Sequence, residues 1–290
     1  MQPIMGRSGS PRLARLCADS DWIEERGPVD GVQLLQAWFT GPAYARHRHD
    51  TYGIGVTDVG VQTFEYRGQV EHSRVGQGFV LHPDEPHDGR SGTDGGFGYR
   101  IIYLDPARIA AAARVLTGRP IALPFAPQPV VDDARLARAV ADGFGAAPEP
   151  LALDDLVVRL TACLLEAAHE PGSGAAERVD RVAMGRVHEY LGARPAIVRS
   201  TELESIVGLN RYEIARQFRR LYGTSPYRYS LLRRLDVARA LLGAGVPLAA
   251  LALEAGFADQ GHFTRSFKAA YGLPPGRYVT LKRRGGNHES

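Results

Sequence analysis

The stretch that decides the fold runs from Arg234 to Tyr278 and reads RLDVARALLGAGVPLAALALEAGFADQGHFTRSFKAAYGLPPGRY. Glycine ends helices because it adopts the left-handed conformation without strain, so Gly243 and Gly245 predict the end of a long helix. A short helix then leads to Gly256, which permits a tight turn, and Asp259 is a good N-terminal cap for the helix that follows. Two short helices around a glycine turn predict a helix-turn-helix unit.

The second helix of this unit has two different faces. Phe263, Phe267 and Ala270 recur at helical spacing and predict a buried stripe. The remaining positions are polar, small or cationic: Gln260, Gly261, Thr264, Arg265 and Lys268. A helix with such an outward face is suited to the major groove of DNA.

An earlier segment of the chain repeats this order of elements. Ser200 starts a helix that runs through Val207, Gly208 turns the chain, and Asn210 with Glu213 has the spacing of a capping box. The outward positions of the following helix are Arg211, Tyr212, Ala215, Arg216 and Arg219. The sequence therefore predicts two units that can each read DNA, joined by a long helix.

At these positions the sequence resembles the AraC/XylS family of transcription regulators. The segment Gly223-Thr224-Ser225-Pro226 matches the end of the family's first unit. The rest of the motif is carried by Arg234-Leu235, Ala238, Leu241-Leu242, Leu251-Ala252, Gly256-Phe257, His262-Phe263, Phe267-Lys268, Gly272, Pro275 and Tyr278. The resemblance covers residues 178–283 and implies base contacts from the outward faces of the two second helices, at Arg216 and Arg265 among others.

The charges of the chain are unevenly distributed. Residues 178–290 contain 19 Lys and Arg against 9 Asp and Glu, a net charge of +10, whereas residues 1–177 contain 16 against 23, a net charge of −7. The two parts together give the formal +3 of the whole chain. A basic segment that bears two helix-turn-helix patterns indicates neutralisation of DNA phosphates.

Length and composition agree with a two-domain cytoplasmic protein. A chain of 290 residues is long enough for two cores. Cys17 and Cys163 have no metal or disulfide spacing, so we expect reduced thiols. Residues 1–20 lack the apolar run of a signal peptide and are expected to form a loose tail, and no segment is long enough for a membrane span.

Residues 21–105 show a different pattern, with short extended runs between glycine and proline. Thr63–Tyr66 alternates, Phe79–His82 is a compact apolar run, and Tyr99–Leu104 has the composition of a strand buried on both faces. This pattern favours a β-barrel or jelly roll. The spacing of His47-Arg48-His49 and His87 resembles a cupin barrel and the effector-binding domain that precedes AraC-type DNA-binding regions.

Three roles remain open for the histidines of this segment. A period of two places His47 and His49 on one face of a strand, and closure of a cupin-like barrel places His87 opposite them. They are candidate metal ligands, candidate contacts to a polar effector, or structural residues at the barrel mouth. Metal cupins have a Glu shortly after the His pair, and this chain has Asp50-Thr51-Tyr52-Gly53-Ile54 there, so no metal site is predicted. The predicted effector-binding residues are His47, His49, Tyr52, Tyr66, His87 and Arg100.

Residues 106–169 predict amphipathic helices. Leu136, Val140 and Phe144 recur at helical spacing, as do Leu153, Leu156, Val157, Leu160 and Leu164 further along. These stripes either cover the barrel or, as the family resemblance favours, pack against the same helices of a second subunit. Residues 170–177 contain a Pro-Gly-Ser-Gly run and are predicted to form a linker.

Together these patterns predict an α+β protein with a cupin-like barrel, flanking helices, and an all-α DNA-binding domain over residues 178–284, followed by a short tail at 285–290. We expect a regulator that binds double-stranded DNA and a small effector, forms a homodimer, contacts RNA polymerase, and needs no cofactor. The alternative from a different class is a metal-dependent cupin enzyme, an oxygenase or isomerase, with a DNA-binding appendage.

Overall fold

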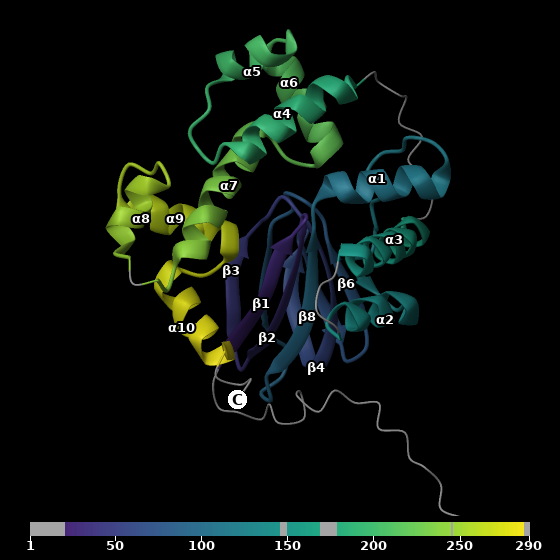
Figure 1. The fold of residues 1–290 in the computed structure, drawn as a ribbon. Coiled ribbons are helices and arrows are strands. Elements are labelled where there is room, and N and C mark those ends of the chain that lie inside the picture. Colours follow the sequence, from purple (N-terminus) through teal and green to yellow (C-terminus); the bar gives the residue numbers. More distant parts are fainter. Residues whose placement is uncertain (1–20, 146–149, 169–178, 245, 287–290) are drawn as a thin grey trace, which may run out of the picture.

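A computed structural model describes residues 21–145, 150–168, 179–244 and 246–286. An antiparallel sheet domain with three helices on one side is followed by an all-helical domain that packs over the open end of the sheet (Figure 1). The α+β class and the two-part organisation predicted from the sequence are confirmed. The predicted tail at 1–20 and linker at 170–177 lie outside the described residues.

The sheet domain contains nine strands in the described part of the chain. Their order is β1-β2-β8-β4-β6-β9, with β5 and β7 paired to β4 and with β3 paired to β7. The strands are β1 (Trp22–Val29), β2 (Val32–Phe39), β3 (Pro42–His47), β4 (Tyr52–Tyr66), β5 (Gln69–Arg74), β6 (Gly78–Leu81), β7 (His87–Ser91), β8 (Phe97–Leu104) and β9 (Val130–Val131).

Strand β4 closes this sheet into a barrel-like shape because it belongs to two layers. Its first half pairs with β6 and β8, and its second half pairs with β5 and β7. The change occurs near a register shift between Thr57 and Val59, and at Gly60, whose φ of +69° suits glycine. A Cβ at position 60 would lie 2.1 Å from the carbonyl oxygen of Gly96.

Helices α1 (Pro106–Thr117), α2 (Ala134–Gly143) and α3 (Pro150–Ala167) cover the outer face of this barrel. The leucines at 153, 156, 160 and 164 are buried in one core with Ile54, Ile102 and Leu104 of the sheet. The hypothesis that these leucines form a dimer seam is therefore wrong, since their stripe is already covered by the barrel of the same chain. Strand β9, within this predicted helical segment, was not foreseen.

The C-terminal domain contains the two predicted helix-turn-helix units. The helices are α4 (Arg181–Ala193), α5 (Ser200–Val207), α6 (Arg211–Tyr222), α7 (Pro226–Leu241), α8 (Leu248–Glu254), α9 (Gln260–Tyr271) and α10 (Pro275–Gly286). Asn210 and Glu213 form the predicted capping box of α6, and Asp259 caps α9. Helix α7 connects the units, and each unit has its own buried aromatic core.

The two domains share an extensive contact. Leu273 and Leu281, which belong to the turn before α10 and to α10 itself, are buried in the inner core of the sheet domain. Ala45 N donates a hydrogen bond to the carbonyl oxygen of Gly272 across 3.1 Å. Helix α10 lies along β1, and α7 crosses the open end of the barrel (Figure 1). The helical domain therefore forms a lid on the barrel interior.

Candidate functional site

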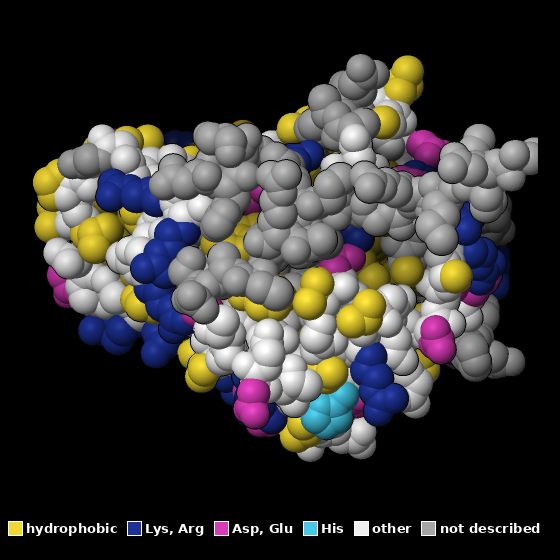
Figure 2. Space-filling view, turned by 90° about the horizontal axis from the view of Figure 1, so that it is seen from below, with side chains coloured by type: hydrophobic (Ala, Val, Ile, Leu, Met, Phe, Trp, Pro, Cys, Tyr) yellow, Lys and Arg dark blue, Asp and Glu magenta, His cyan; other side chains and the backbone are white. Residues whose placement is uncertain are grey.

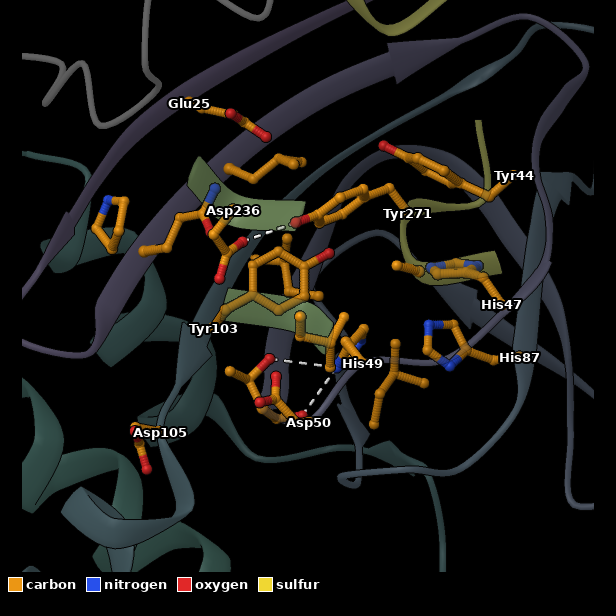
Figure 3. A pocket seen from close by; sticks show the side chains of 18 of the residues that line it. Glu25, Tyr44, His47, His49, Asp50, His87, Tyr103, Asp105, Asp236 and Tyr271 are labelled. Carbon is orange, nitrogen blue, oxygen red and sulfur yellow. Dashed lines mark hydrogen bonds between the residues drawn. The ribbon is translucent and has the colours of Figure 1, made fainter. Parts of the chain in front are cut away.

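A cavity of about 140 Å³ lies between the interior of the sheet domain and the helical lid. This space is much larger than a single water requires, so it can hold a small organic molecule. The polar side chains that the sheet domain contributes include Glu25, Tyr44, His47, His49, Asp50, Gln62, His87, Tyr99 and Tyr103. The helical domain contributes His188, Tyr222, Tyr229, Arg233, Asp236, Arg239, Tyr271 and Tyr278. Asp236 and Tyr271 are labelled in Figure 3.

Helix α7 presents one continuous face to this cavity. Tyr229, Leu232, Arg233, Asp236 and Arg239 all line it, and their separations of three and four residues place them on one side of the helix. This face is charged in its second half, whereas an isolated domain core would be apolar. The sequence pattern alone did not reveal this face, because its partner is the other domain.

Ion pairs connect α7 to the sheet domain. Arg239 lies 3.3 Å from a carboxylate oxygen of Glu25, and both side chains are nearly buried, at 10% and 6% exposed. Arg233 lies 3.3 Å from Asp50. Asp236 joins the two arginines within α7, at 3.1 Å from Arg233 and 3.3 Å from Arg239. The network is therefore continuous from β1 through α7 to the loop after β3.

Two tyrosine hydroxyls extend this network. Tyr271 donates a hydrogen bond of 2.7 Å to Asp236, which is drawn as a dashed line in Figure 3, and Tyr278 donates one to Glu25. Burial raises the pKa of Asp50 to about 6, and the neighbouring carboxylates of Asp236 and Asp105 add to the increase, against the lowering effect of Arg233. The raised pKa of Asp50 is therefore mainly an effect of burial, which disfavours the charged carboxylate.

The three predicted histidines lie together in the part of the cavity wall that the sheet domain forms. The ring centroid of His87 is 4.3 Å from that of His47 and 4.9 Å from that of His49. Each ring has Nδ1 within 3.0 Å of a backbone carbonyl oxygen two residues away, at Ala45, Thr51 and Glu85. Because a carbonyl only accepts, each Nδ1 donates. Burial lowers the pKa of all three imidazoles, that of His87 to about 4, so they are neutral at pH 7.

No group of three or more His, Cys, Asp or Glu side chains in the described part of the chain is arranged to hold a metal ion. His49 is followed by Asp50, whose carboxylate faces Arg233 and not the imidazoles.

The other three predicted effector residues lie outside the cavity. Tyr52 is buried in the helix-covered core and donates to the carbonyl oxygen of Pro124. The hydroxyl of Tyr66 is held by His82, and Arg100 pairs with Asp58. Arg100 does not line the cavity because side chains alternate along a strand: on β8 the cavity receives Tyr99 and Tyr103, and Arg100 has the opposite parity. The alternation of side chains in residues 99–103 places Tyr99 and Tyr103 on the same face of β8, and this pattern could have predicted both tyrosines as cavity residues.

The predicted DNA-contacting residues lie mainly on the surface. Arg211, Tyr212, Arg216 and Arg219 of α6 are exposed, as are Gln260, Gly261, Arg265 and Lys268 of α9, and Thr264 is half-buried. Arg211 also pairs with Glu204 across the turn at 3.0 Å. A Cβ at position 261 would lie 3.3 Å from Arg265, so glycine leaves room for that arginine.

The basic charge gathers on the helical domain. Figure 2 shows dark blue side chains on the left of the view, which is the side where Figure 1 places α8, α9 and α10. Lys282, Arg283 and Arg284 of α10 are all exposed. The described residues contain no helix that is both long and apolar enough to cross a membrane.

Comparison with known proteins agrees with this arrangement. A family model for the AraC-like ligand binding domain matches residues 31–161, and one for a helix-turn-helix domain matches residues 203–280. A ligand-binding domain followed by two helix-turn-helix units defines a two-domain DNA-binding transcription regulator. The chain belongs to the AraC/XylS family, which consists of transcription regulators and not enzymes. The alternative of a cupin enzyme is therefore wrong.

Relatives differ in how much of the chain they match. The chain is 26% identical over 230 residues to the uncharacterized HTH-type transcriptional regulator YbfI of Bacillus subtilis, a match that covers 76% of this chain and 81% of YbfI. It is 30% identical over 104 residues to the probable transcriptional regulator LumQ of Photobacterium leiognathi, where the match covers 35% of this chain and 42% of LumQ.

Solved structures of ToxT from Vibrio cholerae share the fold. An apo form superposes with a TM-score of 0.61 at 14% identity, covering 88% of this chain and 99% of ToxT. A form with an unsaturated fatty acid bound superposes with a TM-score of 0.59 at 12% identity, covering 90% of this chain and 95% of ToxT. At these identities the likeness shows the common architecture of the two domains.

Proposed function

We propose that this protein is a sequence-specific transcription regulator whose small-molecule effector binds in the cavity between the sheet domain and α7. One observation carries the proposal: the cavity has one wall from the ligand-binding domain and one from the helix that joins both helix-turn-helix units. A molecule bound there contacts both domains at once. Effector binding and the position of the DNA-binding units are therefore coupled.

The coupling works through differential affinity. With the lid closed, Glu25 and Asp50 hold Arg239 and Arg233 of α7. An effector that fits the closed cavity stabilises this arrangement, and one that needs the space of α7 favours separation of the domains. In either case the effector shifts the equilibrium only by its difference in affinity for the two states. Bound ligands in ToxT, a fatty acid in one structure and a naphthyl-butenoic acid in another, support a small-molecule site in this fold.

The two recognition helices have separate roles in this proposal. Arg216 of α6 and Arg265 of α9 contact bases, since an arginine bound to the two acceptors of a guanine discriminates base pairs. Arg219 and Lys268 lie further along each helix and contact phosphates, together with Arg211 and Tyr212. Gln260 and Thr264 complete the face of α9, where Gly261 supplies space and no side chain.

Assembly and location follow from the same role. We propose a cytoplasmic homodimer that binds paired promoter sites and contacts RNA polymerase. Since the inner stripe of α3 covers its own barrel, a dimer contact on this helix would use the outer face with Leu151 and Val158, which are exposed.

A ligand screen on the full-length protein tests this function. Compounds that raise the melting temperature are selected first, because a ligand that binds only the folded state must stabilise it. DNA binding is then measured by fluorescence anisotropy with and without each ligand. We expect a stabilising compound to change the Kd for DNA, and the change to disappear in a His49→Leu variant. Stabilising compounds that never affect DNA binding would contradict the proposal.

A further inference from the structure

The charges that line the cavity are mainly negative. Its lining includes the five carboxylates of Glu25, Asp50, Asp88, Asp105 and Asp236, but only the two guanidinium groups of Arg233 and Arg239. The imidazoles of the histidine cluster add no positive charge at pH 7, because burial lowers their pKa values. Asp88 is paired with Arg90, Asp105 lies 3.6 Å from His188, and Lys282 approaches Glu25 to 3.7 Å, so part of the excess is offset.

The two arginines are already occupied. Each is ion-paired with two carboxylates, Arg233 with Asp50 and Asp236, and Arg239 with Glu25 and Asp236. Each also lies over an aromatic ring of the cavity, with the guanidinium carbon 4.8 Å from the ring centroid of Tyr229 or 5.0 Å from that of Tyr271. Of the nitrogens of these two arginines, Nε of Arg233 is buried without a hydrogen-bond partner. An anionic ligand would have to compete with three fixed carboxylates for these two cations.

The cavity wall also contains acceptors that lack a donor. His49 donates Nδ1–H to the carbonyl oxygen of Thr51, so its Nε2 is an acceptor, and this buried atom has no partner. The side chain of Gln62 is buried as well, and its Oε1 has no partner. A buried acceptor without a partner is unfavourable, and a ligand that supplies N–H groups removes that cost.

We infer that the effector is an organic amine, held with its ammonium group among the carboxylates of the cavity and its body against the tyrosine rings. The inference rests on the proposed function, in which the cavity is the effector site. An ammonium supplies both the positive charge that the carboxylates favour and the N–H donors that His49 and Gln62 lack. Tyr44 and Tyr103 provide aromatic surface that attracts a cation as well as apolar contact. This chemistry is opposite to that of the carboxylic acids bound in the ToxT structures.

Pairs of probes that differ only in the charged group test the inference on the full-length protein. Tyramine is compared with 3-(4-hydroxyphenyl)propanoate, 2-phenylethylamine with 3-phenylpropanoate, and decylamine with decanoate, at pH 7.5. We expect at least one amine to raise the melting temperature by about 5 °C at a concentration about 100 times its Kd, and its carboxylate partner to give no shift. Calorimetric titration then supplies the Kd values.

Matched variants identify the site. Glu25→Gln removes one buried carboxylate, and we expect it to weaken the amine at least about tenfold, which is about 1.4 kcal/mol. Because this change also loosens the contact with α7, Asp50→Asn serves as a second variant with the same expected direction. Asp155→Asn removes an exposed carboxylate on α3, outside the cavity, and should leave the amine Kd unchanged.

The outcomes separate this inference from the proposed function. A carboxylate probe that binds more tightly than its amine partner, and loses affinity in His49→Leu, overturns the amine inference and leaves the effector site in place. The absence of a shift with every amine also overturns it. Probes that bind the cavity without any effect on DNA affinity instead contradict the proposed function.

Discussion

The two walls of the cavity hold their polar groups in different ways. On the sheet side, the imidazoles of His47, His49 and His87 are fixed by carbonyl oxygens of neighbouring residues, so their positions depend on one domain. On the helix side, Arg233 and Arg239 are held by ion pairs that cross between domains. The first wall persists when the domains separate, but the second wall does not. The sheet wall is therefore suited to recognition, and the helix wall to reporting that recognition to the DNA-binding units.

The largest expected effect comes from the packing that supports the sheet wall. Leu160 is fully buried between α3 and the barrel, so Leu160→Glu places a charge in an apolar core and should cost about 4 kcal/mol or more of unfolding free energy, or prevent folding. Val158 on the same helix is 39% exposed, so Val158→Glu should change the unfolding free energy by about 0.5 kcal/mol or less. Urea unfolding measures both. A soluble, folded Leu160→Glu monomer would revive the dimer seam.

The neutral imidazoles predict how stability depends on pH. The pKa of His87 is about 4 in the folded protein, below its ordinary value of 6.5, so between these values the unfolded chain binds more protons. Stability from this group is complete above pH 6.5 and is lost as the pH falls toward 4, by about 3 kcal/mol. We expect His87→Gln to flatten this acid limb in unfolding curves measured from pH 4 to 7.

Asp50, the sheet-domain partner of Arg233 in the helix wall, predicts the opposite sign in the same experiment. The pKa of Asp50 is raised to about 6 from 3.8, so the folded state binds more protons between these values and loses stability as the pH rises through them. Asp50→Asn removes this contribution and should steepen the net rise of stability with pH. If His87→Gln and Asp50→Asn changed the slope in the same direction, the contrast between the histidine cluster and the interdomain ion pair would be incorrect.

The junction of the walls depends on Gly272. This residue has a φ of +73°, and a Cβ there would lie 2.9 Å from both His47 Nδ1 and Tyr44 Cβ. Gly243 has a φ of +95° but open space around it. Gly272→Ala should therefore lower the unfolding free energy by about 1 to 3 kcal/mol more than Gly243→Ala does. Thermal unfolding compares the two variants. Equal costs would show that the lid does not rest on the barrel at this turn.

The sequence predicted the parts of this molecule that are determined locally. Asn210 with Glu213 and Asp259 specify helix starts through their own side chains. The period of two along the strand paired His47 with His49, and the resemblance to a cupin barrel brought His87 to them. The cavity needed information of longer range. The sequence predicted Arg100 as an effector contact, but Tyr99 and Tyr103 of the same strand line the cavity instead. Which alternate side chains of β8 point into the barrel depends on how the sheet closes. The cavity face of α7 depends on docking between domains, which no local pattern records.

The DNA-contacting residues are predicted to differ in their effects although they lie on the same helices. Arg216→Ala and Arg265→Ala should each relax base preference by about 1 to 3 kcal/mol, at two sets of base pairs about 10 to 10.5 base pairs apart. Lys268→Ala should weaken binding to all DNA sequences alike and lower the slope of log Kd against log salt concentration by about one. In vitro selection with salt titration distinguishes these roles. Overlapping base-pair sets for Arg216 and Arg265 would exclude two separate reading helices.

The most direct test of coupling between the cavity and DNA changes the sheet side of the interdomain ion pairs and leaves the DNA-binding domain intact. The double variant Glu25→Gln, Asp50→Asn removes the barrel's partners of Arg239 and Arg233, and Asp155→Asn on the outer face of α3 serves as the control. The Kd for a selected promoter fragment is measured by fluorescence anisotropy for the full-length proteins. We predict that the double variant changes this Kd about fivefold or more, because the position of α7 is released, and that the control matches the wild type. A double variant that is folded and binds DNA with the wild-type Kd would contradict the claim that the cavity controls the DNA-binding units through α7.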